Sequence, residues 1–259
     1  MSFVIHDLDP APVLRGVVRR AVDFDERTAG PVRRVEAPML GVVVLISLGP
    51  DIEVAGERTG SFAAGLWDRP VVTGHFGAQR GYQLYLDLFG ARRLLGVPMS
   101  ELANRLVPLE ELLGREAGEL TERIAGARDA AGRHAVAQEA LTHRLADYSC
   151  GAPEVARALG RIRATHGAVR VRELAAEAGW STRHLTARFR AEVGLAPKSV
   201  ARLARVERSA SLLRAGRPLA DVAYAGGYAD QPHFTREFRA LVGCTPGEFR
   251  FVQDTPAAT

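Results

Sequence analysis

Lysine and cysteine are almost absent from this chain of 259 residues. Lys198 is the only lysine, so nearly all of the 34 basic side chains are arginine. Arginine suits bidentate contacts to guanine or phosphate, although a GC-rich genome also favours its codons. The two cysteines, Cys150 and Cys244, lie far apart in the sequence. This argues against a disulfide framework or a four-cysteine zinc site, and we interpret both thiols as inert.

Long apolar runs are also missing. No stretch of about 18 apolar residues occurs, which argues against a membrane span. The first residues lack the basic region and long apolar core of a secretion signal, so we expect a cytoplasmic protein. In the β-like part of the sequence only His6 and His75 are available as imidazole ligands. We therefore expect neither a metal site nor another cofactor.

The charge is divided unevenly along the chain. From residue 151 onward there are 17 basic against 10 acidic side chains, whereas the preceding residues carry 17 against 20. A basic half attracts phosphates at long range and releases counterions on docking. Many soluble domains are mildly basic, so this surplus indicates a phosphate-bearing partner only in combination with the sequence repeat described next.

That repeat covers residues 174–197 and 222–246. Upstream of a bend the two copies are offset by 48 residues, as Gly179 and Gly227 show. Downstream the offset is 49, so one residue was inserted where the chain bends. Each copy predicts a short helix, a glycine turn and a second helix, which is a helix-turn-helix. The pairs that coincide downstream are His184/His233, Thr186/Thr235, Phe189/Phe238, Arg190/Arg239, Ala191/Ala240, Gly194/Gly243 and Pro197/Pro246.

The local signals within each copy predict where its helices begin and end. In the first copy residues 171–178 form the supporting helix, Gly179 takes the left-handed turn, and Ser181 or Thr182 caps the next helix. In the second copy residues 219–225 are followed by a Gly226-Gly227 turn and by Asp230 as cap. Residues 197–215 predict a linking helix. The side chains expected to face inward are Leu185, Phe189, Val193, Tyr228, Phe234, Phe238 and Val242.

The opposite faces of the two second helices point to DNA. Arginine pairs with the guanine edge, glutamine with adenine, and a threonine methyl meets the thymine methyl. Each good bidentate pair contributes about 1–3 kcal/mol of discrimination. A solvated surface side chain is the alternative for each residue. We expect base contacts from Arg183, Thr186, Ala187, Gln231, Pro232, Thr235 and Arg236, and phosphate contacts from Thr182, Arg190 and Arg239. His184 and His233 are expected to pack or cap rather than bind metal.

The N-terminal half has a different texture. Up to about residue 88 the pattern predicts short strands, at 42–48, 71–73 and 82–88, typical of a small barrel or sandwich. Beyond residue 90 it predicts helices. Their ranges are 91–96, 100–106, 109–114 and 116–147, the last either continuous or broken near Asp129.

These patterns predict an α+β protein in two domains. Residues 1–147 form an effector-sensing or dimerisation domain, 148–152 a linker, and 153–259 the DNA-binding domain. The helix-turn-helix units span about 171–193 and 219–242. A helix over residues 153–166, with Pro153 in its first turn and Gly167 after its end, opens the second domain.

Residues 153–250 resemble the AraC/XylS family of bacterial transcription regulators. The family signature is carried by Val222-Ala223, Gly227-Tyr228, His233-Phe234, Phe238-Arg239, Gly243, Pro246 and Phe249-Arg250. The resemblance implies two helix-turn-helix units joined by a long helix that bind double-stranded promoter DNA. It further implies a cupin-like β-barrel with trailing helices at the N-terminus, a small-molecule effector, and RNA polymerase as partner of an activator. The oligomeric state stays open, with a homodimer as one alternative.

An effector pocket is predicted from the aromatic residues of the N-terminal half. The alternative is that these side chains form plain core. The residues concerned are Phe62, Trp67, Phe76, Tyr82 and Tyr85.

Two other function classes remain open from the sequence. One is a ligand-independent dimeric adaptor that binds DNA. The other is a DNA repair enzyme that accepts alkyl groups on a cysteine, which requires an activated thiolate. We favour the non-enzymatic regulator because Cys150 lies in the presumed linker and Cys244 in a turn.

Overall fold

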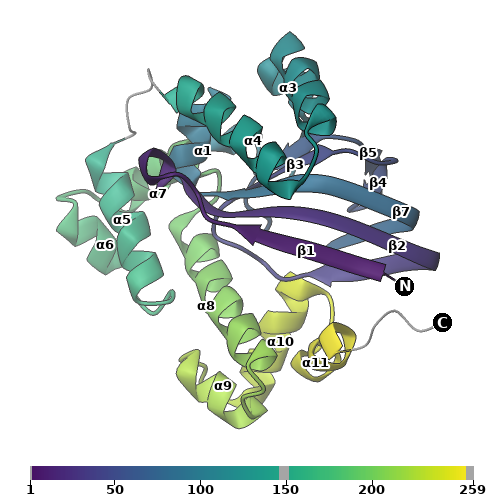
Figure 1. The fold of residues 1–259 in the computed structure, drawn as a ribbon. Coiled ribbons are helices and arrows are strands. Elements are labelled where there is room, and N and C mark those ends of the chain that lie inside the picture. Colours follow the sequence, from purple (N-terminus) through teal and green to yellow (C-terminus); the bar gives the residue numbers. More distant parts are fainter. Residues whose placement is uncertain (1, 146–151, 255–259) are drawn as a thin grey trace. The chain divides into compact units, whose positions relative to one another are not determined.

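The computed structural model describes residues 2–145 and 152–254 (Figure 1). The chain divides into two compact units, which are considered separately below. Unit 1 comprises Met1–Val32, Gly41–Gly65 and Gly74–Cys150, and unit 2 comprises Arg33–Leu40, Leu66–Thr73 and Gly151–Thr259. Residues 148–151 of the expected linker, and Cys150 with them, lie outside the described residues.

Unit 1 is built on an antiparallel sheet. The strand order is β1-β2-β7-β3-β6-β8, and β4 pairs with β5 and β7. Ile46 lies opposite Tyr82 where β3 and β7 pair. The strands are β1 (Ser2–Leu8), β2 (Val18–Glu36), β3 (Val42–Ser47), β4 (Ile52–Val54), β5 (Glu57–Thr59), β6 (Phe62–Ala64), β7 (Val71–Leu86) and β8 (Leu106–Pro108). This sheet and the helical C-terminal half confirm the α+β class.

Strand β7 corrects one detail of the expected strand pattern. Residues 71–73 and 82–88 were expected to form two strands, but β7 is continuous and ends at Leu86. Glycines interrupt its alternation of apolar and polar residues, so the sequence pattern breaks where the strand does not. Gly81 lies in close packing, since a Cβ there would lie 3.0 Å from the Ile46 carbonyl oxygen and 3.1 Å from both the Phe24 ring and the Leu45 side chain. Strands β1 and β2 lie in the region expected to be mostly β, but they were not predicted as separate strands, and β2 carries many charged residues.

The helices of unit 1 follow the sheet. They are α1 (Leu88–Leu95), α2 (Leu109–Leu113), α3 (Arg115–Gly126) and α4 (Ala130–Arg144). Asp129 caps α4 by accepting the N–H of Gly132 at 2.8 Å, which confirms a break at this residue. The helix expected over residues 100–106 is wrong. The 3₁₀ turn η2 (Met99–Glu101) lies there instead, and β8 begins at Leu106.

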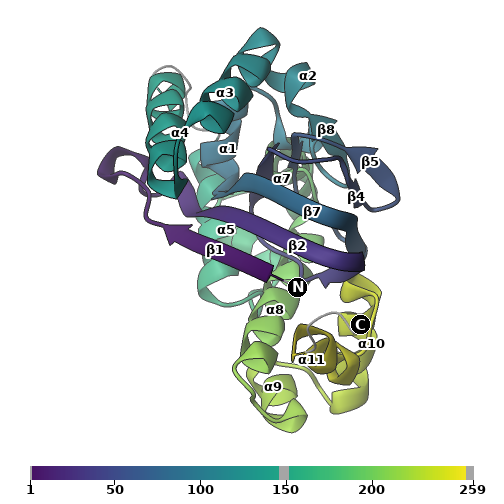
Figure 2. The ribbon, with the colours of Figure 1, turned by 45° about the vertical axis from the view of Figure 1, so that its right-hand side comes forward.

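Unit 2 is helical in its C-terminal part. Helix α8 contacts α5, α7, α9, α10 and α11 through a buried face that includes Val200, Leu203, Val206 and Leu213. Figures 1 and 2 show α5–α7 toward one end of α8 and α9–α11 toward the other. The helices are α5 (Pro153–Ala164), α6 (Val171–Glu177), α7 (Thr182–Val193), α8 (Pro197–Arg214), α9 (Leu219–Ala225), α10 (Gln231–Val242) and α11 (Pro246–Asp254). The expected linking helix is therefore present.

Gly167 fixes the end of α5 against α8. Its φ is +80°, which glycine adopts at low cost, and its N–H donates to the Ile162 carbonyl at 2.8 Å. A Cβ at this position would lie 2.0 Å from the Ala201 carbonyl oxygen of α8. No side chain fits there unless the two helices separate.

We expect Gly167→Ala to lower the free energy of unfolding by at least about 2 kcal/mol, because it adds backbone strain to a steric clash. Gly160→Ala is the matched control. Gly160 lies within α5, and a Cβ added there would meet only open space, so alanine should stabilise by about 0.5–1 kcal/mol. Urea unfolding followed by tryptophan fluorescence measures both. Equal midpoints for the two variants would contradict this account of Gly167.

Candidate nucleic-acid interface

The first helix-turn-helix unit is organised by a tight turn between α6 and α7. Gly179 has a φ of +69°, and the N–H of Trp180 donates to the Ala175 carbonyl at 2.9 Å. Ser181 then caps α7 by accepting the N–H of His184 at 3.2 Å. Of the two caps expected, Ser181 is therefore the one used, and Thr182 is the first helical residue.

The second unit repeats this construction between α9 and α10. Gly227 has a φ of +67°, whereas Gly226 keeps an ordinary helical φ of −80°. The N–H of Tyr228 donates to the Ala223 carbonyl at 3.1 Å, which matches the Trp180 bond at an offset of 48. Asp230 caps α10 by accepting the N–H of His233 at 2.6 Å. The repeat seen in the sequence is therefore a repeat of backbone geometry.

The inward faces of α7 and α10 are apolar, as predicted. Every side chain that the spacing placed inward is buried. In the second unit the rings of Phe234, Phe238 and Phe249 pack in series, with centroids 5.6 and 5.4 Å apart. The buried set consists of Leu185, Phe189 and Val193 in the first unit and Tyr228, Phe234, Phe238 and Val242 in the second.

A histidine contacts an aromatic ring in each copy. The ring of His184 meets Trp180 edge-on at a centroid distance of 4.7 Å, and His233 meets Tyr228 in the same manner at 5.4 Å. Both histidines are the third residue of their helix, and both aromatic residues follow the turn glycine. Each pair therefore braces the turn against the start of the second helix.

The outward faces carry the residues expected to contact DNA. Thr186 and Thr235 are half-exposed, and the others are exposed. The Thr186 hydroxyl donates to the Thr182 carbonyl at 2.8 Å, so the hydroxyl proton already has an acceptor within α7. Among the described residues, Arg183 and Arg236 have no ion-pair partner. The exposed set is Thr182, Arg183, Ala187, Arg190, Gln231, Pro232, Arg236 and Arg239.

An ion-pair cluster that the sequence did not predict holds α10 against α8. The Glu237 carboxylate of α10, 9% exposed, lies 3.1 Å from Arg202 Nε and 3.0 Å from Arg205 Nη2, both on α8. The only signal in the sequence is the three-residue spacing of the two arginines, which gives no hint of a partner 32 residues away. The cluster fixes the inner side of α10 while its outer side stays exposed.

Cys244, between α10 and α11, does not have the environment of a reactive thiol. Burial raises the pKa of the Cys244 thiol, and the nearby Glu248 carboxylate raises it further. A nucleophilic cysteine requires the opposite shift, which favours the thiolate. The alkyl-transfer hypothesis gains no support from this residue.

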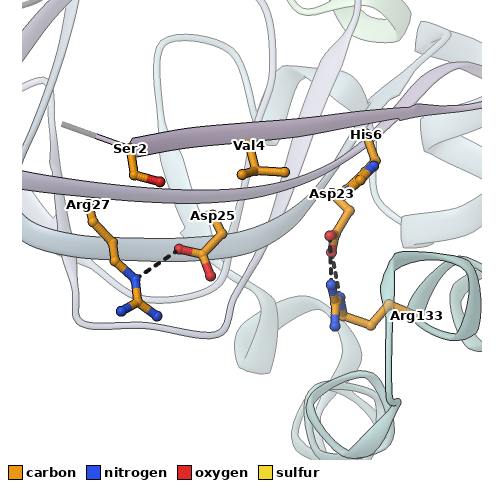
Figure 3. Close-up of a pocket in the computed structure, with 7 residues that line it drawn as sticks. All are labelled: Ser2, Val4, His6, Asp23, Asp25, Arg27 and Arg133. Atoms are coloured by element: carbon orange, nitrogen blue, oxygen red, sulfur yellow. Dashed lines mark hydrogen bonds and ion pairs between the residues drawn. The ribbon is translucent and has the colours of Figure 1, made fainter.

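Unit 1 contains a polar cavity of about 360 Å³, wide open to solvent, between the β1–β2 hairpin and α4 (Figure 3). Arg133 of α4 reaches Asp23 of β2 with two hydrogen bonds, of which Nη2–Oδ2 measures 2.7 Å, and this raises the pKa of the arginine. Arg27 and Asp25 form a looser pair at 3.6 Å. Ser2, Val4 and His6 of β1 complete the lining.

The aromatic residues expected to line an effector pocket do not line this cavity. Tyr82 is buried and hydrogen-bonds His134 at 2.7 Å, and Phe62 is also buried, whereas Phe76 is 71% exposed. Tyr85 lies beneath the Arg20 guanidinium, and Trp67 belongs to unit 2. The cavity itself was missed, although Asp23, Asp25 and Arg27 alternate on one strand face and give a faint signal.

No helix among residues 2–145 and 152–254 has the length and apolar character needed to cross a bilayer.

When the sequence is compared with known proteins, the matches fall in its C-terminal half. Residues 174–251 match the family described as a helix-turn-helix domain. An AraC-like transcription regulator of Streptomyces antibioticus is 38% identical over 81 residues, which are 31% of this chain and 27% of that protein. The chain thus matches only about a quarter of the length of this curated relative.

Solved structures match over nearly the whole chain. ToxT from Vibrio cholerae in its P21 crystal form has a TM-score of 0.51 at 9% identity and covers 97% of this chain and 99% of its own. ToxT with a bound unsaturated fatty acid has a TM-score of 0.50 at 10% identity, covering 96% and 95%. At such identities the likeness shows the fold alone.

We expect Glu237→Gln to lower the free energy of unfolding by about 2 kcal/mol, because two partly buried guanidinium groups lose their carboxylate partner. Asp221→Asn is the control. Asp221 pairs with Arg217 at 3.7 Å and both side chains are more than half exposed, so its loss should change stability by less than about 0.5 kcal/mol. Urea unfolding compares the two. A Glu237→Gln protein as stable as the wild type would show that the cluster does not hold α10.

Proposed function

We propose that this chain, whose residues 174–251 are a DNA-binding helix-turn-helix domain of the AraC type, regulates transcription by inserting two recognition helices into promoter DNA. The observation that carries the proposal is the repeated geometry of α7 and α10. Each helix follows a left-handed glycine, begins at a polar cap and buries an aromatic side chain on its inner face. Each leaves a row of polar, cationic and small side chains on its outer face, where the major groove is read.

The roles of the outward residues follow from their chemistry. Arg183 and Arg236 have guanidinium groups without an ion-pair partner among the described residues, so each is available to guanine. Gln231, the first residue of α10, suits an adenine edge. The two threonines offer methyl groups to thymine, and Ala187 and Pro232 offer apolar contact only.

Phosphate contacts position the two helices. Arg190 and Arg239 each lie about two turns into their helix, further from the end that enters the groove. Thr182 stands at the start of α7, where exposed backbone N–H groups favour an anion. Such contacts give affinity that falls with salt and carry no sequence preference.

The length of α8 supports simultaneous docking of both units. Its 18 residues span about 27 Å at 1.5 Å per residue. The two helix-turn-helix units pack toward opposite ends of α8 (Figure 2). Successive major grooves on one side of a duplex are about 34 Å apart. One chain would thus bind two adjacent half-sites, with residues 153–259 acting as the DNA-binding domain.

We assign effector sensing or dimerisation to residues 1–147. The neighbouring ToxT structure was solved with an unsaturated fatty acid. The cavity in unit 1 favours a different chemistry, because Val4 is the single apolar side chain among its seven lining residues. A small charged molecule fits this lining better than an aliphatic chain does. RNA polymerase is the further partner if the chain activates, and the second candidate function is a ligand-independent dimeric adaptor.

For the DNA contacts, we expect Arg236→Ala to weaken binding to the preferred site by about tenfold and to relax preference at one base pair. Arg239→Ala should instead lower affinity for all sequences and flatten the salt dependence. Quantitative gel shifts on a selected operator and its point variants, at several salt concentrations, measure both. Equal losses on every duplex for both variants would refute this division of roles.

For the effector, we expect a small charged metabolite to raise the melting temperature of the full chain by several degrees, through preferential binding to the folded state. Asp25→Asn should abolish the shift because it removes a charge from the cavity. Asp7→Asn is the control, since Asp7 lies on the same hairpin, pairs with the exposed Arg20 and does not line the cavity. A broad panel with no stabilising compound would favour the adaptor.

A further inference from the structure

The two recognition helices can be numbered in one frame. Ser181 and Asp230 are their caps, and each accepts the backbone N–H of the third helical residue, His184 or His233. Each helix has 12 residues and ends at a glycine with positive φ. A given helical position therefore has the same place relative to the cap, the buried face and the turn in both units.

Most positions are occupied by equivalent residues in this frame. The fifth and ninth positions are outward-facing and identical, and the fourth and eighth are buried and apolar or aromatic. Such agreement indicates that the two helices enter their grooves in the same way. The matched pairs are Leu185/Phe234, Thr186/Thr235, Phe189/Phe238 and Arg190/Arg239.

Three positions that are exposed in both helices carry different residues. The first position has the polar residues Thr182 and Gln231, whereas the second and sixth positions differ in opposite senses. At the second position the first unit has Arg183 and the second unit has Pro232. At the sixth position the first unit has Ala187 and the second unit has Arg236. All four residues are exposed. The cationic and the apolar residue have therefore changed places between the two helices.

The exchange has a geometric consequence on DNA. Positions two and six lie about 6 Å apart along a helix axis, at 1.5 Å per residue. Base pairs are stacked at about 3.4 Å, so the two positions face base pairs that are roughly two steps apart. Arginine in the groove selects guanine, and an exposed methyl or ring methylene selects the methyl group of thymine.

We infer that the operator is made of two unlike half-sites in which the order of guanine and thymine, counted from the N-terminal end of each recognition helix, is reversed. This rests on the proposed function. The first half-site has guanine at the Arg183 position and thymine at the Ala187 position. The second has thymine at the Pro232 position and guanine at the Arg236 position.

The decisive variant exchanges the two residues in the first unit, Arg183→Pro with Ala187→Arg. Proline is tolerated at the second position because α10 already carries it there, and Ser181 caps through His184, not through the N–H that proline removes. A second variant, Arg183→Ala with Ala187→Arg, makes the same exchange without proline. The melting temperature of each full-length variant shows that the domain still folds.

The experiment selects binding sites for the wild type from a random duplex library and then repeats the selection with the exchanged variants. The guanine preference lost in Arg183→Ala marks the first half-site, and the one lost in Arg236→Ala marks the second. In the exchanged variants we expect the guanine preference of the first half-site to move by about two base pairs, with about tenfold discrimination. The preference of the second half-site should stay in place.

A chemical substitution tests the thymine positions independently. Replacing thymine by uracil removes only the 5-methyl group, and at the two inferred positions we expect affinity to fall about fourfold. Two identical half-sites, an unmoved guanine preference or full affinity for uracil at both positions would overturn the inference while leaving the regulator intact. A wild type that enriches no sequence would instead overturn the proposed function, and this inference with it.

Discussion

The burial of one aromatic side chain in each recognition helix is the constraint on which the rest of unit 2 depends. Phe189 and Phe238 are fully buried at equivalent positions, and each fixes the rotation of its helix about its own axis. Because side chains three and four residues apart share a face, that rotation decides which residues stay exposed. The same hydrophobic contact that stabilises the domain thus selects the residues available to a partner.

Some arginines in this domain hold helices together and others stay exposed and available to a partner. The number of arginines is therefore a poor guide to the proposed DNA contacts. Arg202 and Arg205 bind Glu237, and Arg250 donates to the Gly216 and Arg217 carbonyls. Arg161 and Arg188 are likewise paired, with Glu177 and Glu192. The basic surplus counted from the sequence therefore includes many side chains that hold helices together, and the outward face of α7 and α10 has only a few.

The C-terminal half was predictable because its signals are local. Glycines with positive φ, Ser181 or Asp230 at a cap, and apolar residues spaced by four all act within one or two turns of chain. The N-terminal half depends on contacts between distant residues. Asp23 is buried in a strand because Arg133, 110 residues later, neutralises it, and no local pattern reveals this. Dependence on distant contacts also explains why β1 and β2 were not predicted as separate strands and why the cavity and the Glu237 cluster were missed. The outward-facing residues of α7 and α10, by contrast, followed from periodicity.

Helix α8 joins the two helix-turn-helix units, and their exposed faces differ. Because α8 is one continuous helix, the first unit always lies toward its start and the second toward its end. A symmetric dimer that reads a palindrome is indifferent to which way the duplex runs. A single chain with unlike ends is not, because rotating it by half a turn would present each unit to the wrong bases. In the proposed complex one bound chain therefore has an upstream and a downstream side, and the inferred pair of unlike half-sites is not itself an inverted repeat.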